Sequence, residues 1–173
     1  MKRHFLLTLL FSGVISINIL GQCNDMIYEI DECISNCENS YSYLKKAYKE
    51  VDYVEYTDSY NDLKEALEIA QTLCEKGKSS AEDAQSNASD ASSYASECNC
   101  SDGESYSSNA ESNADDSYSY AKKAYGYIDD ALYTDNLEDM KYFVDDILRY
   151  LKNAYNAIEE SKSEAESAKY ECE

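Results

Sequence analysis

The sequence predicts an all-α protein in which two tandem antiparallel helical hairpins form an elongated four-helix, coiled-coil-like bundle with an Ala/Ser-rich seam. The 173-residue chain has no proline and only five glycines, so long uninterrupted helices are the default expectation. Small and apolar residues recur at alternating spacings of four and three, which is a heptad a/d pattern. The block Ser40–Tyr48 occurs again at Ser117–Tyr125, 77 positions later, which indicates an internal duplication.

The first 21 residues have the pattern of a secretory signal peptide. Lys2 and Arg3 precede a mostly apolar stretch that ends at Leu20, and a small residue, Gly21, follows it. The stretch is short and interrupted by polar residues, which argues against a retained membrane-spanning helix. Cys23 lacks the small preceding residue that a lipid-modified cysteine needs, which argues against a lipoprotein. We therefore expect an exported protein, either periplasmic or secreted.

Four segments carry the heptad pattern, two in each copy of the repeat. In the first copy, residues 22–99, they run from about residue 25 to 55 and from 58 to 98. In the second copy, residues 100–173, the third segment surrounds the repeated block and the fourth runs from about residue 135 to 172. The residues expected at the seam are Met26, Ile30, Cys33, Cys37, Ser40, Leu44, Ala47, Val51 and Val54; Leu63, Leu67, Ala70, Cys74, Gly77, Ala81, Ala84, Ala88, Ala91, Ala95 and Cys98; Ser107, Ala110, Ala114, Ser117, Ala121, Ala124, Ile128 and Ala131; and Met140, Val144, Ile147, Leu151, Ala154, Ile158, Ser161, Ala165, Ala168 and Cys172.

Three short turns separate the expected helices. The Tyr-Thr-Asp turn at 56–58, repeated at 133–135, offers Thr or Asp as a helix N-cap, and Asp135 has capping-box spacing to the acidic residue three positions later. In the central turn Ser101 and Glu104 have the same spacing. The antiparallel register places bulky seam residues near the Tyr-Thr-Asp turns and small ones (Ala, Ser, Cys) at the opposite end, and it also makes the first helix a neighbour of the fourth.

Tyrosine is unusually frequent, with 18 residues, and many of them flank the seam at heptad positions e and g. We expect these rings to cover a thin alanine core with their hydroxyls at the wet edge, since an aromatic stripe at helical spacing is usually core. The alternative is an aromatic binding surface for carbohydrate or a protein partner. The flanking tyrosines are Tyr41, Tyr48, Tyr118, Tyr125 and Tyr155 at e, and Tyr43, Tyr94, Tyr106, Tyr120, Tyr127 and Tyr150 at g.

All seven cysteines follow the signal peptide, so disulfides are expected in an exported protein. The register places Cys23, Cys98, Cys100 and Cys172 at one end of the bundle. We predict the bonds Cys23–Cys98 and Cys100–Cys172, each closing the open end of its own hairpin. A Cys23–Cys172 bond is the alternative pairing.

The other three cysteines, Cys33, Cys37 and Cys74, have no cross-helix partner in this register. Cys33 and Cys37 lie one helical turn apart and could bond each other only with strain. Because seven is odd, at least one thiol stays free, buried or intermolecular. The Cys98-x-Cys100 spacing does not match a redox or metal motif, and no histidine lies near it to complete one.

The chain is strongly acidic, with 35 Asp and Glu residues against 15 Lys and Arg and a formal net charge of −20. We interpret this charge as the solvated outer face of long helices, which keeps the protein soluble. It argues against binding to nucleic acid or anionic membranes, and we expect no membrane insertion after signal cleavage. It leaves a basic partner or cations as candidate ligands.

No catalytic pattern stands out. The single histidine, His4, lies in the signal peptide, and the sequence has neither a Gly-rich phosphate loop nor a cysteine with an evident base. We therefore expect no enzyme, no cofactor and no metal site. The leading hypothesis is a structural or interaction protein of the cell envelope or exterior, with another protein or a second copy of itself as partner. The alternative is a module that binds glycan or another small ligand through tyrosine and carboxylate side chains.

Overall fold

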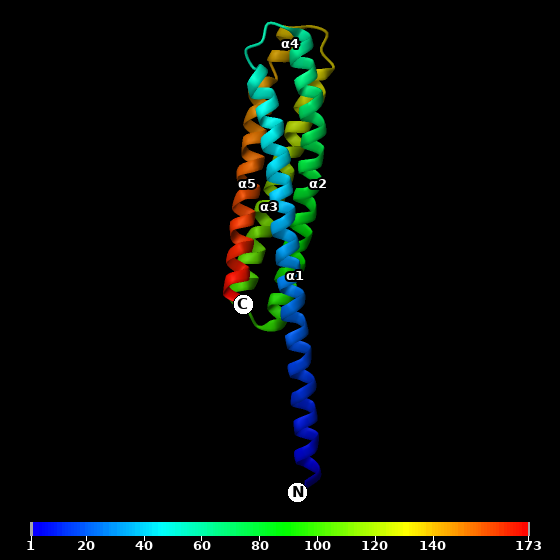
Figure 1. Ribbon diagram of the computed structural model, residues 1–173, viewed down its shortest axis with the longest axis vertical. Coiled ribbons are helices and arrows are strands. Elements are labelled where there is room, and N and C mark those ends of the chain that lie inside the picture. Colours follow the sequence, from blue (N-terminus) through cyan, green and yellow to red (C-terminus); the bar gives the residue numbers. More distant parts are fainter. Residues whose placement is uncertain (1, 173) are drawn as a thin grey trace.

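A computed structural model describes residues 2–172, with the backbone alone for residues 2–20 and Gln22. The helices are α1 (Lys2–Val54), α2 (Tyr60–Cys98), α3 (Ser101–Leu132), α4 (Leu137–Lys141) and α5 (Val144–Cys172). The four long helices pack lengthwise, and short α4 leads into α5 (Figure 1). The predicted all-α four-helix bundle is confirmed, but the fourth predicted helix is divided at Tyr142 and Phe143.

The side chains of the predicted signal peptide, residues 1–21, lie outside the described part of the structure. Within the part of the chain that the structure describes, no helix has both the length and the apolar character needed to cross a membrane.

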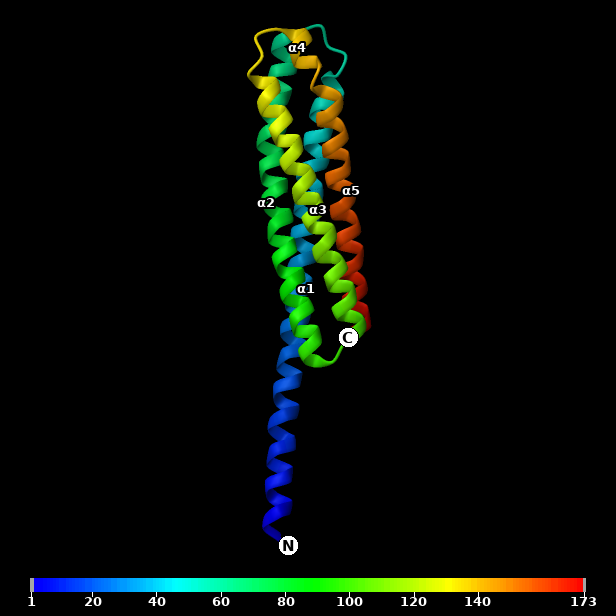
Figure 2. The same cartoon turned by 180° about the vertical axis from the view of Figure 1, so that it is seen from behind.

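The helices are arranged so that α1 packs against α2 and α5, and α3 packs against the same two helices from the other side. Helices α1 and α3 are therefore diagonal, and the two hairpins are related by an approximate two-fold axis along the bundle. Both hairpin turns lie at one end, which we call the tip (residues 53–60 and 133–143). The central turn and the C-terminus of α5 lie at the other, which we call the cysteine end (Figures 1 and 2).

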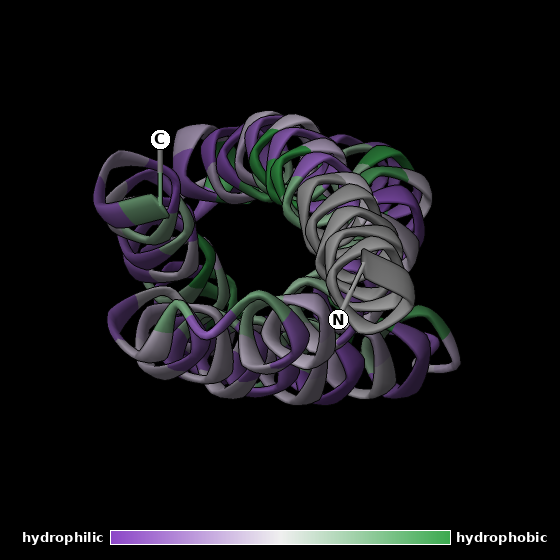
Figure 3. Ribbon diagram, turned by 90° about the horizontal axis from the view of Figure 1, so that it is seen from below, coloured by the Kyte–Doolittle hydropathy of each residue, from purple (hydrophilic) through white to green (hydrophobic). Residues whose placement is uncertain are grey.

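The predicted seam forms the core. Every seam residue named above is buried except Val54, Cys98 and Cys172, which are half-buried near the ends of the bundle. Viewed along the axis, the four long helices surround this common core (Figure 3). The core is bulkier towards the tip, where leucine, isoleucine and methionine cluster, and is mostly alanine towards the cysteine end, as the register predicts.

The duplication is visible in a pair of buried hydrogen bonds inside the two hairpins. Ser40 Oγ donates to the carbonyl oxygen of Gly77 at 2.9 Å, and its copy Ser117 Oγ donates to the carbonyl oxygen of Ala154 at the same distance. Both members of each pair are offset by 77 residues. The same hydrogen bond therefore joins the two helices of each hairpin at the equivalent place, which accounts for the serine at this seam position in both copies.

The two hairpins distribute side-chain volume differently around this hydrogen bond. In the first hairpin Leu44 lies against Gly77, where an added Cβ would be 2.6 Å from Leu44 Cγ. The corresponding residues of the second hairpin are Ala121 and Ala154, which are both small. A large residue paired with glycine in one copy therefore occupies the place of two alanines in the other, at a similar total volume.

Two further serines are buried near the middle of the bundle and the cysteine end. Ser161 Oγ donates to the carbonyl oxygen of Ala110 at 2.7 Å, which links α5 to α3. Among the described side chains, the Ser107 hydroxyl is buried without a hydrogen-bond partner. Such a group costs free energy, so we expect Ser107 to weaken the fold.

The repeated block places an aromatic ring beneath a lysine in both hairpins. The ammonium of Lys45 lies 4.6 Å from the centre of the Tyr41 ring, and that of its copy Lys122 lies 5.8 Å from the Tyr118 ring. Tyr155 of α5 makes an edge contact with Tyr41, with ring centres 6.0 Å apart. Aromatic side chains therefore join α1 to α5 where the two hairpins meet.

The helix caps differ from those predicted. The N-caps of α2 and α4 are Ser59 and its copy Asn136, each one residue beyond the predicted Tyr-Thr-Asp turns, and both accept a backbone N–H bond. At the central turn the N-cap is Cys100, not Ser101, and its side chain is held in a disulfide. Asn99 ends α2 in the left-handed conformation, with φ of 62°.

Candidate interaction surface

The tip carries a group of tyrosines that have little to pack against. Tyr53, Tyr56, Tyr133 and Tyr142 expose 90%, 85%, 81% and 80% of their surface. Tyr53 lies at the end of α1, Tyr56 and Tyr133 lie in the two turns, and Tyr142 follows α4. We call these four residues the tip tyrosines. They are exposed aromatic rings gathered at one end of the bundle, which is the pattern of an interaction site.

The duplication makes two of these residues equivalent. Tyr133 is the copy of Tyr56, and the approximate two-fold axis places both at the same end of the bundle. The turns that carry them are tied together, because the Tyr60 hydroxyl donates to the carbonyl oxygen of Thr134 at 2.9 Å. The tip is therefore one surface built from both repeats.

Carboxylates lie beside Tyr56, one of the tip tyrosines. The Glu55 side chain hydrogen-bonds with Tyr56, and this bond together with the negative charge of Glu55 raises the pKa of the phenol. Asp52 and Asp145 act in the same direction. The charge of Asp58 is partly balanced by Lys141, whose ammonium lies 3.5 Å from it. Exposed aromatic faces beside carboxylates form an environment that attracts Lys and Arg side chains.

The flanking tyrosines behave differently from the tip tyrosines. All eleven of the predicted e and g tyrosines are half-buried, and all but Tyr43 pack against the core. The packing interpretation holds for that group. The heptad pattern does not predict the tip tyrosines as a surface, because the turns containing Tyr56 and Tyr133 indicate only helix caps. The available signal was that Tyr56 and Tyr133 lie outside the heptad seam, in a turn that occurs twice.

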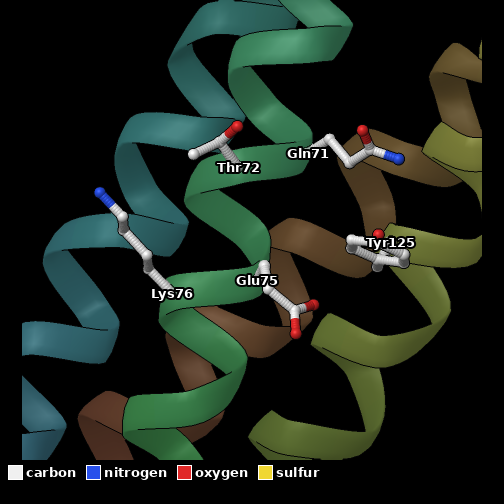
Figure 4. A pocket seen from close by; sticks show the side chains of 5 residues that line it. All are labelled: Gln71, Thr72, Glu75, Lys76 and Tyr125. Atoms are coloured by element: carbon white, nitrogen blue, oxygen red, sulfur yellow. The ribbon is translucent and has the colours of Figure 1, made fainter.

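Several shallow depressions lie along the described part of the bundle, and one of them lies between α2 and α3. It has a volume of about 320 Å³, and its lining residues are Gln71, Thr72, Glu75, Lys76 and Tyr125. Figure 4 shows Gln71 and Glu75 extending towards the helix that carries Tyr125, whereas Lys76 extends away. The side-chain amide of Gln71 donates a hydrogen bond to the carboxylate of Asp129 at 3.2 Å. The depression is open and its groups do not converge, so it is a weaker candidate than the tip.

The cysteine end contains one disulfide. Cys100 and Cys172 are bonded, with their Cα atoms 6.1 Å apart, and the bond closes the open end of the second hairpin. Gly103 leaves room for the two sulfurs, because an added Cβ would lie 2.9 Å from Cys100 Sγ and closer still to Cys172 Sγ. The alternative Cys23–Cys172 pairing is therefore not the one in the structure.

The second predicted bond, Cys23–Cys98, is not formed in the structure. Both residues are half-buried free thiols, and their side chains share a hydrogen bond. In the first hairpin the residue equivalent to Cys172 is Ala95, and Cys98 lies one helical turn beyond it. The residue equivalent to Gly103 is Met26. The geometry of the bonded pair is therefore not repeated residue for residue in the first hairpin.

The remaining cysteines are buried free thiols. Cys33 and Cys37 share a hydrogen bond, which together with burial raises the pKa of Cys33. The Cys37 thiol donates to Ser161 Oγ at 3.5 Å. Cys74 donates to the carbonyl oxygen of Ala121 at 3.2 Å, and burial raises its pKa to about 12. These thiols act as small apolar core residues with weak hydrogen bonds.

The described residues contain no group of three or more His, Cys, Asp or Glu side chains that could hold a metal ion. Comparison with protein-family models and with curated proteins finds no match to this sequence.

Proposed function

We propose that the protein is an exported helical spacer that binds a partner protein through its tip. The observation that carries this proposal is the exposure of the four tip tyrosines at one end of the helical bundle. The signal-peptide pattern and the Cys100–Cys172 disulfide support export, since structural disulfides persist in oxidising compartments.

The partner surface is expected to be cationic. The tip combines aromatic faces with Glu55, Asp52 and Asp145, and the whole chain is acidic. Lys and Arg side chains can stack on tyrosine and pair with carboxylates at the same time. A protein segment rich in Lys or Arg can therefore interact with both the tyrosine rings and the carboxylates of the tip, whereas a neutral ligand has no positive charge to pair with the carboxylates.

The test is a binding measurement with a defined set of probes. The full chain is immobilised and exposed to Lys/Arg-rich peptides, to the same peptides with Gln in place of the basic residues, and to an array of neutral glycans. Binding of the basic peptides alone, weakened at least tenfold when Tyr53, Tyr56, Tyr133 and Tyr142 are replaced by Ala, is the expected result.

The matched control replaces Tyr28 and Tyr170, which are 61% and 82% exposed but lie far from the tip. This control should bind as the parent does. If both sets of substitutions weaken binding equally, the tip is not the site. Glycan binding that depends on the tip tyrosines would replace the protein-partner proposal with a carbohydrate one.

A further inference from the structure

The thiols of Cys23 and Cys98 lie together at the cysteine end, outside the proposed interaction surface. Cys23 lies within α1, at the start of the part whose side chains are described, and Cys98 is the last residue of α2. They are 75 positions apart in the chain, yet their side chains share a hydrogen bond. Both are half-buried, so a small oxidant can reach them.

The internal duplication relates this pair to the disulfide that is already formed. Cys23 and Cys100 are equivalent positions, 77 residues apart; Cys100 is the N-cap of α3, whereas Cys23 lies within α1. Cys98 and Cys172 each end the second helix of their hairpin. The cysteine end thus carries one bonded pair and one unbonded pair in corresponding places, and the local difference is that Cys98 lies one turn further along.

We infer that Cys23 and Cys98 are a redox-closable pair, which an oxidising disulfide converts into a second covalent closure of the bundle. Cys23 as thiolate attacks the disulfide of the oxidant, forms a mixed disulfide and releases one thiol. Cys98 then loses its proton and attacks the Cys23 sulfur, which forms the Cys23–Cys98 bond and releases a second thiol. Two protein thiols are oxidised, and one disulfide of the oxidant, such as glutathione disulfide, is reduced to two thiols.

The assignment of Cys23 as the first nucleophile follows from the surroundings of Cys98. Burial and the hydrogen bond with Cys23 raise the pKa of Cys98 to about 12, so its thiolate is scarce at neutral pH. Cys98 also donates to the carbonyl oxygen of Tyr94 at 3.0 Å, which favours its protonated form. Its role is therefore to resolve a mixed disulfide held beside it, where proximity compensates for low ionisation.

The experiment treats the full chain with glutathione disulfide, blocks remaining thiols with an alkylating agent and maps the peptides by mass spectrometry. The expected product is a Cys23–Cys98 linked peptide with no lasting glutathione adduct, beside the Cys100–Cys172 peptide. In Cys98→Ser the Cys23 thiol should instead accumulate a glutathione adduct, since the resolving thiol is missing, whereas Cys23→Ser should form little adduct, because the Cys98 thiolate is scarce. Cys74→Ser is the matched control and should close the pair as the parent does.

Three outcomes overturn the inference. One is that Cys23 and Cys98 of the parent are both still alkylated after oxidation. Another is that the parent accumulates as much glutathione adduct as Cys98→Ser, and the third is that Cys23 becomes linked to a cysteine other than Cys98. None of these outcomes depends on whether the tip binds a partner. The redox inference and the proposed function can therefore each be contradicted without affecting the other.

Discussion

Replacing Gly103 by Ala should selectively weaken the Cys100–Cys172 disulfide. The added methyl group would lie 2.9 Å from Cys100 Sγ and nearer to Cys172 Sγ, so the bonded sulfurs and the methyl cannot occupy the same space. The bond spans 72 residues, and closing such a loop is worth about 4 kcal/mol in the chain-entropy model. Alanine recovers up to about 1 kcal/mol of helix propensity. The expected net loss is about 3 kcal/mol.

The assay is urea unfolding followed by far-UV circular dichroism, with and without a reducing agent. Gly126→Ala is the matched control, because Gly126 lies in the same helix and an added Cβ there has no neighbour within 4 Å. It should stabilise the protein by up to about 1 kcal/mol in both conditions. Gly103→Ala should lose stability only under oxidising conditions and should equal or exceed the parent once both are reduced. Full retention of the disulfide and of parental stability in Gly103→Ala would refute the reasoning.

Three further predictions concern the core. Gly77→Ala should destabilise the protein by about 1–3 kcal/mol through overpacking against Leu44, and adding Leu44→Ala should cost less than the sum of the single changes. Ser117→Ala should cost about 1 kcal/mol by removing a buried hydrogen bond, whereas Ser107→Ala should be neutral or stabilising. Burial raises the pKa of Cys74 from 9.0 to about 12, so stability should fall as pH rises between these values, by at most about 1.4 kcal/mol per unit.

Each of these predictions has a measurement that can contradict it. Urea midpoints decide the first two: additive losses for Leu44→Ala and Gly77→Ala, or equal losses for Ser107→Ala and Ser117→Ala, would show that the proposed contacts do not matter. For Cys74, the comparison is the slope of unfolding free energy against pH above pH 9 in the parent and in Cys74→Ala. An unchanged slope would mean that the buried thiol does not carry the alkaline effect.

The fold was predictable because burial in a long amphipathic helix is governed by one periodicity. Once the heptad pattern is assigned, residues such as Ile30 and Ile128 must face inwards, and they do. The antiparallel register followed from the short turns. The caps were missed because Ser59 and Asn136 compete with neighbouring Thr and Asp residues of nearly equal capping preference, and only the backbone geometry decides between them.

The tip could not be predicted in the same way. Periodicity shows which face of a helix is buried, but it contains no information about residues such as Tyr56 and Tyr133 that lie in turns. Likewise, the register brings Cys23 and Cys98 to the same end, but it does not resolve a displacement of one helical turn. That displacement distinguishes a thiol pair that shares a hydrogen bond from the bonded pair in the second hairpin.

The contrast between the two ends follows from how the duplication is folded. Because the turn at Asn99 is short, the second hairpin folds back beside the first, and the approximate two-fold axis runs along the bundle. Equivalent residues therefore meet at the same end: Tyr56 and Tyr133 at the tip, Cys23 and Cys100 at the other. The 39 residues of α2 span about 58 Å at 1.5 Å per residue, so the two ends are far apart. Covalent closure can thus stabilise one end of the bundle without restricting access to the tyrosines at the other.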